Sequence, residues 1–277
     1  MLSNLFFLVK LIRVLKKNNV LLLIRGNIKY KLIFTIITNL LSVGVSYNKS
    51  VINKPDGQRI AQSLNELGPS FIKLGQLIST RPDIVGSTIA EDLSLLRDNL
   101  PPFSTAKAIE IVESEFDEKI ENIFLEFSEP IAAASIAQVH FAKIKISGNE
   151  INVAVKVLRP EIEKIIGLEM ERLEWITMFM ENFTEFKRLR PNSIIKKAKE
   201  VIKFELDLRY EAAAASELSE NTNMDESFYV PKIYWESVTQ KVLTMERIVG
   251  TPADKINELI EKKVDLKKAS ENLIINF

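Results

Sequence analysis

The chain has 277 residues, of which 46% are hydrophobic, so it can bury a sizeable core in one large domain or two ordinary ones. It contains no cysteine and one histidine, His140, which excludes disulfides and thiolate chemistry and argues against a histidine-rich zinc site or a Ser-His-Asp triad. The formal net charge is zero, yet nine basic and no acidic residues precede Asp56, leaving 28 basic against 37 acidic residues in the remainder.

Residues 1–54 form a basic arm whose charges interleave with aliphatic side chains. Lys10, Arg13 and Lys16 or Lys17 are three or four residues apart, which is typical of an amphipathic helix lying on a membrane surface. The charges follow the apolar run instead of preceding it, unlike those of a secretory signal. The aliphatic neighbours of these charges argue against nucleic acid as a partner, because stacking aromatic residues are not interleaved with them.

The longest uncharged run of the arm, residues 32–48, also contains polar residues. It falls short of the roughly 18 apolar residues that indicate a spanning helix. We therefore expect residues 1–48 to lie at a membrane interface. A helical hairpin packed against the rest of the protein is the alternative.

A helical region is predicted from the turn at residues 55–57 to about Asn99, before two consecutive prolines. Within it, residues 71–80 read F-I-K-L-G-Q-L-I-S-T, with apolar side chains on one helical stripe and Lys73 and Gln76 on a second. Gly75 stands inside this helix, where glycine costs about 1 kcal/mol relative to alanine. Either another backbone or a ligand approaches it closely, or it is a packing glycine beside a solvated lysine.

A further helix is predicted after Ser104 or Thr105, either of which can cap it. From Phe124 the pattern changes to period two, and two β-rich runs joined by a Gly-containing turn predict a hairpin. His140 lies in the first of these runs, where we expect a structural histidine with its hydrogen bonds satisfied.

The second run of the hairpin alternates between two faces. One face carries three valines, and the other carries the only charged side chain of the alternating segment. The two sets are Val153, Val155 and Val157 on one face, and Ala154, Lys156 and Leu158 on the other.

Helices are predicted again from Glu161 to about Glu220, with a break near Arg190, and two short β-like pieces follow at residues 228–236 and 240–247. The last helix begins after Asp265 as a cap, and the chain is expected to end inside it. Its expected apolar face comprises Leu266, Ala269, Leu273 and Phe277. Helical regions that flank and interrupt a set of strands predict an α+β fold.

Three carboxylates occur close together in V-I-K-F-E-L-D-L-R-Y-E-A, namely Glu205, Asp207 and Glu211. At about 100° per residue, Glu205 and Asp207 diverge on a regular helix, whereas Asp207 and Glu211 share a face. We therefore expect separate partners for Glu205 and Asp207. A solvated acidic face is the alternative.

The order of elements, a strand, a tight loop, a strand ending in A-V-K, a helical region and two more strands, is that of the small lobe of a protein kinase-like fold. Four stretches in this order resemble the UbiB/ADCK atypical kinase-like family of ubiquinone biosynthesis. They are F-I-K-L-G-Q-L-I-S-T-R-P-D, A-A-A-S-I-A-Q-V-H, V-A-V-K-V-L-R-P and E-L-D-L-R-Y-E-A. The resemblance covers the chain from about Asp56 to its end.

The resemblance implies a nucleotide site for ATP or ADP with Mg²⁺, at which we expect the truncated chain alone to bind nucleotide weakly at best. Lys156 would be the phosphate-binding lysine and Glu211 its ion-pair partner, and Met245-Glu246-Arg247 would be the linker whose backbone meets adenine. In place of a glycine-rich loop, the phosphates would be covered by a stiffer loop that comprises Ala132, Ala133, Ala134, Ser135, Ile136, Ala137 and Gln138.

The resemblance also implies a regulatory element. A helical extension carrying K-x-G-Q would fold over the nucleotide cleft, with Lys73 and Gln76 facing it and Gly75 permitting the close approach. The residues that they approach would be the E-x-D pair, Glu205 and Asp207.

The sequence departs from the family where the family places its chemistry. The H-x-D catalytic loop, a magnesium-binding asparagine and a D-F-G-like aspartate are absent, and after Arg247 the only aspartates are Asp254 and Asp265. We therefore expect no catalytic residue in this chain, and a truncated large lobe. The expected segments are the arm at 1–54, the K-x-G-Q extension at 55–123, a kinase-like small lobe at 124–247 and the start of the large lobe at 248–277.

The expected function is that of a UbiB-type kinase or ATPase-like protein that supports ubiquinone biosynthesis at the cytoplasmic face of a membrane. Its expected partners are nucleotide, the membrane surface through residues 1–48, and ubiquinone-biosynthesis enzymes or lipid precursors. The alternative is a non-catalytic, membrane-tethered lipid- or protein-binding module. A complete module would be soluble without the large lobe, whereas an apolar face that ends at Phe277 would lack its partner.

Overall fold

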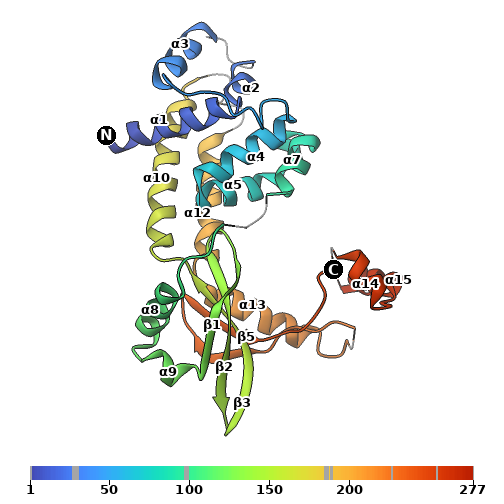
Figure 1. Ribbon diagram of the computed structural model, residues 1–277. Helices are drawn as coiled ribbons and strands as arrows, with labels where there is room; N and C mark the ends of the chain where they lie inside the picture. The colour runs from blue at the N-terminus through green and yellow to red at the C-terminus, as the bar shows by residue number, and fades with distance from the viewer. Residues whose placement is uncertain are drawn as a thin grey trace. The chain divides into compact units, whose positions relative to one another are not determined.

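The computed structural model describes residues 2–26, 31–96, 100–183, 187, 190–225, 227–253 and 255–276 (Figure 1). These residues form two compact units, each assembled from separate chain segments. The helical unit comprises Met1–Pro101, Ala133–Ile136 and Glu161–Phe204, and the sheet unit comprises Pro102–Ala132, Ala137–Pro160 and Glu205–Phe277. The division into four segments expected from the sequence stays a prediction.

The helical unit contains the arm and the extension that carries K-x-G-Q. Its helices are α1 (Leu2–Lys17), α2 (Leu21–Gly26), α3 (Lys31–Leu41), α4 (Asp56–Leu67), α5 (Pro69–Ser79), α6 (Pro82–Val85), α7 (Ser87–Ser94), α10 (Ile162–Met180) and α12 (Pro191–Glu205), the last of which ends one residue beyond the unit. In the described part of the chain, none of the helices combines the length and the apolar character that crossing a bilayer requires.

The sheet unit holds five strands in the spatial order β1-β2-β3-β5-β4 (Figure 1). The pairs β2–β3, β3–β5 and β4–β5 are antiparallel. The elements are α8 (Thr105–Phe116), α9 (Ile120–Ile123), β1 (Glu126–Ala133), β2 (Ala137–Ile146), β3 (Asn149–Leu158), α13 (Leu208–Asn221), β4 (Ile233–Val238), β5 (Val242–Glu246), α14 (Ile256–Glu261) and α15 (Leu266–Asn276). Helices combined with this antiparallel sheet confirm the predicted α+β, kinase-like fold class.

The core of the sheet unit lies between one face of the sheet and α8. Val153, Val155 and Val157 of β3 are fully buried and pack with Ala108 and Val112 of α8. The side chain of Ser104 accepts a hydrogen bond from the Lys107 N–H and thereby caps α8. The predicted alternation of β3 and the predicted cap are therefore both confirmed.

The helical region predicted from residue 55 onward is interrupted more often than the pattern indicated. Gly68 and Gly86 have φ angles of 116° and 86°, and each separates two helices. Such angles are available to glycine at little cost, so the chain turns at both places. The end predicted at Asn99 lies outside the described residues. At the other end of the protein, the Asp265 carboxylate accepts from the Lys268 N–H, as expected of a cap, whereas Phe277 lies outside the described residues.

One face of the first helix of the arm packs on the helical unit, while Leu2, Leu5 and Phe6 are exposed, and the expected membrane contact of residues 1–48 stays a prediction. Phe7 and Ile12 are buried, and the Phe7 ring lies 6.0 Å from that of Phe71 in α5. The Arg172 guanidinium of α10 lies over the same Phe7 ring, 5.5 Å from its centroid, and donates to Ser3. Helix α1 is therefore a structural element of this unit along much of its length.

Candidate functional site

An ion pair between β3 and α13 forms the centre of the candidate site in the sheet unit. Lys156 Nζ lies 2.8 and 2.7 Å from the two carboxylate oxygens of Glu211. The Lys156 side chain is 24% exposed and that of Glu211 is 46% exposed, so the pair is open to a solute. The pairing that the resemblance implied is present, while its role in holding nucleotide stays a prediction.

The strand register decides which neighbours share a face with Lys156, because residues directly opposite each other in antiparallel strands point to the same side. Lys156 is opposite Val139 of β2 and Leu243 of β5, and Ala154 is opposite Met245. Met245 therefore lies on the face of the sheet that carries Lys156. The three core valines of β3 occupy the other face.

By the same rule, two residues of the predicted nucleotide loop, Ala137 and Gln138, lie on opposite faces of the sheet. Ala137 is opposite Leu158 and shares the Lys156 face, whereas Gln138 is opposite Val157 and faces the core. Gln138 is buried, and its Oε1 accepts from the Phe103 N–H at 2.9 Å. Its side chain thus supports the core of the sheet unit.

His140 is a structural residue of that core, as expected. Its Nδ1 lies 2.8 Å from the Ser128 carbonyl oxygen, and its Nε2 lies 2.8 Å from the amide nitrogen of Gln138. The ring stacks on Phe127 at 4.5 Å. Burial lowers the pKa of His140, although the Ser128 carbonyl acts in the opposite direction.

The loop between β1 and β2 has an extended or turn-like backbone without a positive φ angle from Ala132 to Gln138. The absence of positive φ angles is expected, because alanine adopts them only at an energetic cost. Ser135 and Ile136 are buried, and the Ser135 hydroxyl has no hydrogen-bond partner among the described residues. Ala133–Ile136 belong to the helical unit, so their predicted contact with phosphate stays a prediction.

The E-x-D residues do not lie on one regular helix. Helix α12 ends at Glu205, and Asp207 is the N-cap of α13 with its side chain accepting from the Arg209 N–H at 3.1 Å. The regular helix assumed for Glu205, Asp207 and Glu211 is therefore interrupted before Asp207, while the expectation of separate partners for Glu205 and Asp207 stays a prediction. Both Asp207 oxygens also accept from the Arg209 guanidinium, at 2.8 and 2.7 Å, and these hydrogen bonds lower the pKa of Asp207.

Gly75 permits a close approach by two leucine side chains. A Cβ placed on Gly75 would lie 2.5 Å from the Cδ1 atoms of both Leu64 and Leu96. Gln76 Nε2 donates to the Leu96 carbonyl oxygen at 3.3 Å, which ties the same segment to α5. The packing alternative is thus confirmed for Gly75. The expectation that Lys73 and Gln76 face a nucleotide stays a prediction, because these residues belong to the helical unit.

The predicted linker begins inside β5, which contains Met245 and Glu246. The Glu246 N–H donates to the Lys232 carbonyl at 2.8 Å, and its carboxylate accepts from the Tyr229 hydroxyl at 2.5 Å. Arg247 lies over the Phe141 ring, 3.6 Å from its centroid. Thr244, which directly precedes Met245, was not predicted from the sequence, because no periodic pattern marks it. Its hydroxyl is buried and has no hydrogen-bond partner among the described residues.

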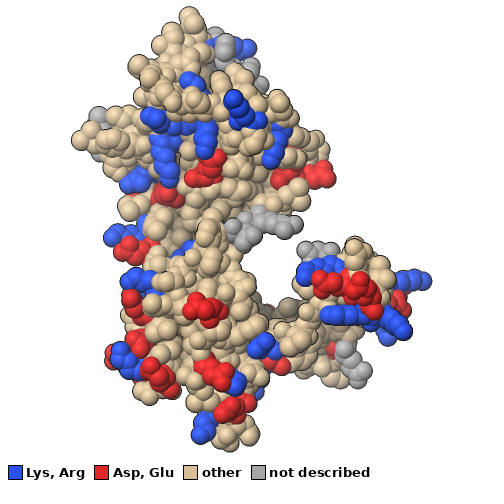
Figure 2. Space-filling view, viewed as in Figure 1, with Lys and Arg blue, Asp and Glu red and all other residues tan. Residues whose placement is uncertain are grey.

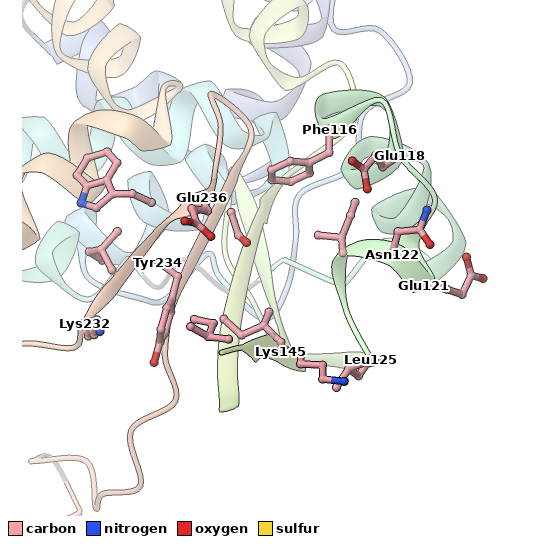
Figure 3. Close-up of a pocket in the computed structure, with 15 residues that line it drawn as sticks. Phe116, Glu118, Glu121, Asn122, Leu125, Lys145, Lys232, Tyr234 and Glu236 are labelled. Carbon is pink, nitrogen blue, oxygen red and sulfur yellow. The ribbon is translucent and has the colours of Figure 1, made fainter. Parts of the chain in front are cut away.

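A cavity of about 520 Å³ opens elsewhere in the sheet unit, between α8–α9, the end of β2 and β4 (Figure 3). Phe116, Tyr234 and Leu125 supply apolar wall, while Lys145 and Glu236 supply opposite charges. Lys156 and Glu211 do not line it. The cavity is therefore separate from the candidate nucleotide site.

A magnesium site does not form from the carboxylates of the described residues. No group of three or more His, Asp or Glu side chains in that part of the chain is arranged to hold a metal ion. The oxygens of Asp207 are engaged by Arg209 and those of Glu211 by Lys156. The residues that are present fit phosphate binding by a lysine and do not fit a magnesium cage.

Residues 95–277 match the family model described as the ABC1 atypical kinase-like domain. The chain is 41% identical over 217 residues to the probable protein kinase UbiB of Pseudomonas putida (strain W619), and 42% identical over 217 residues to that of Cellvibrio japonicus (strain Ueda107). Each match covers 78% of this chain, but only 40% and 39% of the two relatives. The matched stretch is thus less than half of each relative's length.

Proposed function

Because the chain belongs to the ABC1 atypical kinase-like family, we propose that it is the nucleotide-binding part of a UbiB-type atypical kinase or ATPase. In this proposal it binds ATP or ADP through the sheet unit and supports ubiquinone biosynthesis at the cytoplasmic face of a membrane. The observation that carries the proposal is the bidentate contact between Lys156 and Glu211.

The chemistry of that contact suits phosphate recognition. A lysine ammonium has three donors, and a carboxylate that accepts from it orients the ammonium toward a third acceptor. In kinase-like folds the strand lysine and the helix glutamate form this pair while the lysine contacts nucleotide phosphates. Ala154 and Met245, on the Lys156 face, would offer an apolar surface to the adenine ring.

We assign no catalytic base within the chain. Mg²⁺, when bound with nucleotide, would neutralise phosphate charge, but the residues described here supply no metal cage. The proposed work of this chain's own residues is to bind the nucleotide and orient its phosphates. The acceptor of the phosphoryl group, whether water or another molecule, would be determined by the full-length protein.

The test is a thermal shift titration with ATP and ADP, each with and without Mg²⁺. Wild-type protein should melt at a higher temperature as nucleotide is added, because a ligand that binds only the folded state stabilises it. Lys156→Ala should abolish the shift. The matched control is Lys143→Ala, because Lys143 of β2 also forms an exposed ion pair on the sheet, at 2.7 Å from Glu126.

A nucleotide shift that survives unchanged in Lys156→Ala would remove Lys156 from the site. Loss of the shift in both variants would point to damage to the sheet and not to a lost phosphate contact. The melting temperature of each variant without nucleotide, measured in the same experiment, separates these outcomes.

A second candidate function is that of a non-catalytic, membrane-tethered module that binds lipid or protein. The observation that favours it is the exposed apolar surface of the arm, which does not depend on nucleotide. A protein that binds vesicles but shows no thermal shift with any nucleotide would support this second function over the first.

A further inference from the structure

Helix α3 in the arm of the helical unit has its apolar and polar faces reversed relative to a helix of a water-soluble protein. Its outward-facing side chains are aliphatic and between 50% and 73% exposed. They are Leu32, Ile33, Ile36, Ile37 and Leu40, and Val43, two residues past the helix, is 68% exposed. Solvent-facing helical surfaces are normally polar, so this face is fit for an apolar environment.

The inward side of α3 carries hydroxyl residues beside the half-buried Phe34 and Leu41. Thr38 and Ser42 are buried, and Thr35 is half-buried. The hydroxyls of Thr35 and Thr38 donate to the carbonyls of Lys31 and Phe34, at 2.6 and 2.8 Å, and Ser42 donates to the Thr38 carbonyl. Because the helix itself satisfies these hydroxyls, they can pack inward at little cost.

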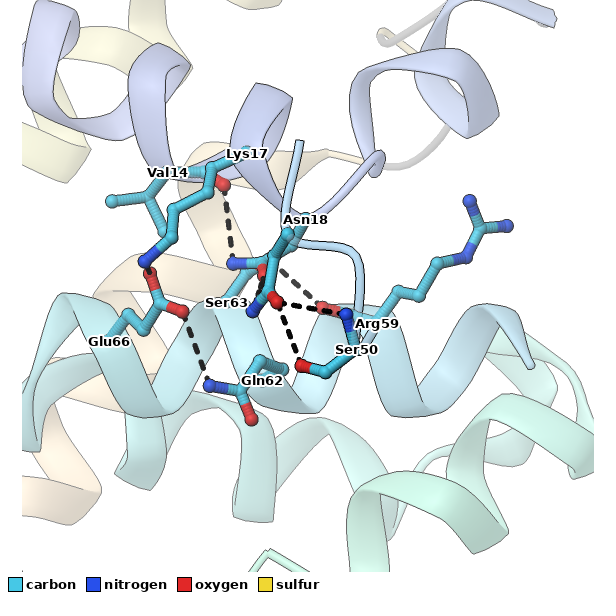
Figure 4. Close-up of polar contacts among 9 residues, drawn as sticks. Val14, Lys17, Asn18, Ser50, Arg59, Gln62, Ser63 and Glu66 are labelled. Carbon is cyan, nitrogen blue, oxygen red and sulfur yellow. Dashed lines mark hydrogen bonds and ion pairs between the residues drawn. The ribbon is translucent and has the colours of Figure 1, made fainter. Parts of the chain in front are cut away.

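The arm is held on the helical unit by polar contacts at the end of α1 (Figure 4). Lys17 Nζ forms an ion pair with Glu66 of α4 at 3.0 Å, and the Asn48 N–H donates to the Lys17 carbonyl at 2.7 Å. Arg59 Nη1 donates to the Asn19 carbonyl at 2.9 Å. These contacts fix both ends of the segment that contains α3. Its exposed face is therefore presented by a folded support.

Positive charge lies beside this apolar face. All nine charged residues before Asp56 are basic, and Lys31 begins α3 itself. Lys16 Nζ donates to Asn39 of α3 at 3.3 Å, so a second ammonium lies beside the helix. Figure 2 shows Lys and Arg side chains gathered on this unit next to the tan surface at the top of the view, where Figure 1 places α3.

We propose that the outer face of α3 docks on an anionic lipid bilayer, with Leu32, Ile36 and Leu40 entering the interfacial region and the neighbouring lysines contacting lipid headgroups. This inference rests on the membrane location in the proposed function, and it assigns the main contact to α3, which exposes five aliphatic side chains, whereas α1 exposes Leu2, Leu5 and Phe6 and buries Phe7 and Ile12. An aliphatic face flanked by lysines such as Lys16 and Lys31 is the pattern of interfacial helices.

The charge decides between a bilayer and a second copy of the chain. Two copies meeting through α3 would bring Lys16 and Lys31 of one arm toward those of the other, and the arm has no acidic residue of its own before Asp56. Such juxtaposition of like charges opposes association. An anionic surface complements the same charges. The bilayer is therefore the occupant that both the apolar and the charged residues favour.

The experiment is vesicle flotation of the full chain. Vesicles of phosphatidylcholine with roughly 30% phosphatidylglycerol are compared with vesicles of phosphatidylcholine alone. The test variant is Ile36→Glu with Leu40→Glu, because both side chains are exposed and the substitutions leave the inward face intact. The control is Met224→Glu with Val249→Glu in the sheet unit, where both residues are more than 90% exposed and the charge change is identical.

Wild type and control should float with the anionic vesicles, and the α3 variant should lose about tenfold or more in partitioning, since it places two carboxylates in the interface. Equal flotation of the α3 variant and wild type would overturn the assignment to α3 but leave membrane binding in place. If wild-type protein does not float, both this inference and the membrane part of the proposed function fall, while the nucleotide titration still stands on its own.

A light-scattering measurement of mass in the absence of lipid tests the rival occupant. A wild-type dimer that becomes monomeric in the α3 variant would overturn the proposal in favour of self-association. A monomer in both cases, combined with loss of flotation in the variant alone, is the predicted result.

Discussion

His140 is buried, and both of its ring nitrogens are hydrogen-bonded. The Ser128 carbonyl can only accept, so Nδ1 carries the ring proton, and Nε2 accepts from the Gln138 amide. A second proton on Nε2 would face that amide group. Rotating the amide would remove the acceptor of the Phe103 N–H. Protonation is thus opposed by burial and by the Gln138 contact, whereas the Ser128 carbonyl acts in the opposite direction.

The stability of the protein should consequently fall as His140 becomes charged. The pKa of His140 in the folded state is lowered from its ordinary value of 6.5, so below that pH the unfolded chain binds the extra proton and the folded chain resists it. The stabilisation is present above about pH 6.5 and is lost as the pH falls toward the lowered folded-state pKa. Urea unfolding at about pH 7.5 and about pH 5.5 should reveal a loss of at most about 1.4 kcal/mol per pH unit.

His140→Gln is the control for this titration, because the chain has no other histidine. Whatever its absolute stability, this variant should show a smaller pH dependence in the same interval. An identical pH dependence in wild type and variant would show that another group is responsible.

Gly75 supports packing between neighbouring helices of the helical unit. Gly75→Ala should gain about 1 kcal/mol of helix propensity but lose more through overpacking, for a net destabilisation of about 1 kcal/mol. The reason is the 2.5 Å approach of the new methyl group to Leu64 and Leu96. Gly167→Ala in α10 is the matched control, because no atom lies within 4 Å of its added Cβ.

Urea unfolding of both variants checks this prediction, and Gly167→Ala should be stabilised. The double variant Gly75→Ala with Leu96→Ala should lose less than the sum of the two single variants, because the added methyl fills part of the space left by Leu96. Additive losses would contradict the packing account of Gly75.

Helix α13 links structure to the candidate site, because it carries Glu211 in its first turns and begins at the Asp207 cap. The cap aligns the first turn by accepting the Arg209 N–H. The position of the Glu211 carboxylate beside Lys156 therefore depends on where this helix starts. Asp207 thus has a structural role regardless of the regulatory role implied by the resemblance.

Substitution of Asp207 separates these two roles. Asp207→Ala should cost about 1 kcal/mol of stability and weaken nucleotide binding about fivefold, whereas Asp207→Asn should retain the cap and most of the affinity. Titration with ATP and Mg²⁺ measures both effects. Ser104→Ala, which removes the cap of α8, should cost similar stability and leave the affinity unchanged. Equal loss in the Asn and Ala variants would mean that the Asp207 charge itself matters.

The elements that sequence predicted best are those with a local cause. The β2–β3 hairpin follows from alternation around Gly148, which has a φ angle of 85°, and the caps at Ser104 and Asp265 follow from side-chain chemistry. The break between α12 and α13 was missed because Glu205 to Glu211 keeps a helix-compatible pattern. Only the capping geometry of Asp207 reveals it.

The arm shows the same limit of sequence reasoning. The pattern of charges favoured α1 as the membrane helix, yet Phe7 and Ile12 are buried in the helical unit. Leu2, Leu5 and Phe6 of α1 are exposed, but the longer exposed apolar face is on α3, where the signal was the spacing of Thr35, Thr38 and Ser42 along a single face. Periodicity identifies two faces of a helix, but tertiary packing decides which of them is buried.

At the scale of the whole protein, each unit is made from three separate stretches of chain. Motifs predicted to act together are therefore divided, with K-x-G-Q in the helical unit and Lys156 with Glu211 in the sheet unit. The ion pair could be predicted because the family resemblance names both partners. A contact of Lys73 and Gln76 with a nucleotide depends on the tertiary structure, which a local sequence pattern does not determine.

The measurement that tests the central claim most directly is labelling with an ATP analogue whose terminal phosphate carries an acyl group. A lysine amine beside the phosphates attacks the acyl carbon and forms an amide, and ATP leaves, so the modified peptide identifies the lysine in the nucleotide site. We predict labelling at Lys156 that excess ATP prevents. Labelling of Lys156 that ATP does not reduce, or ATP-sensitive labelling confined to other lysines, would contradict the assignment of the nucleotide site to the Lys156–Glu211 pair.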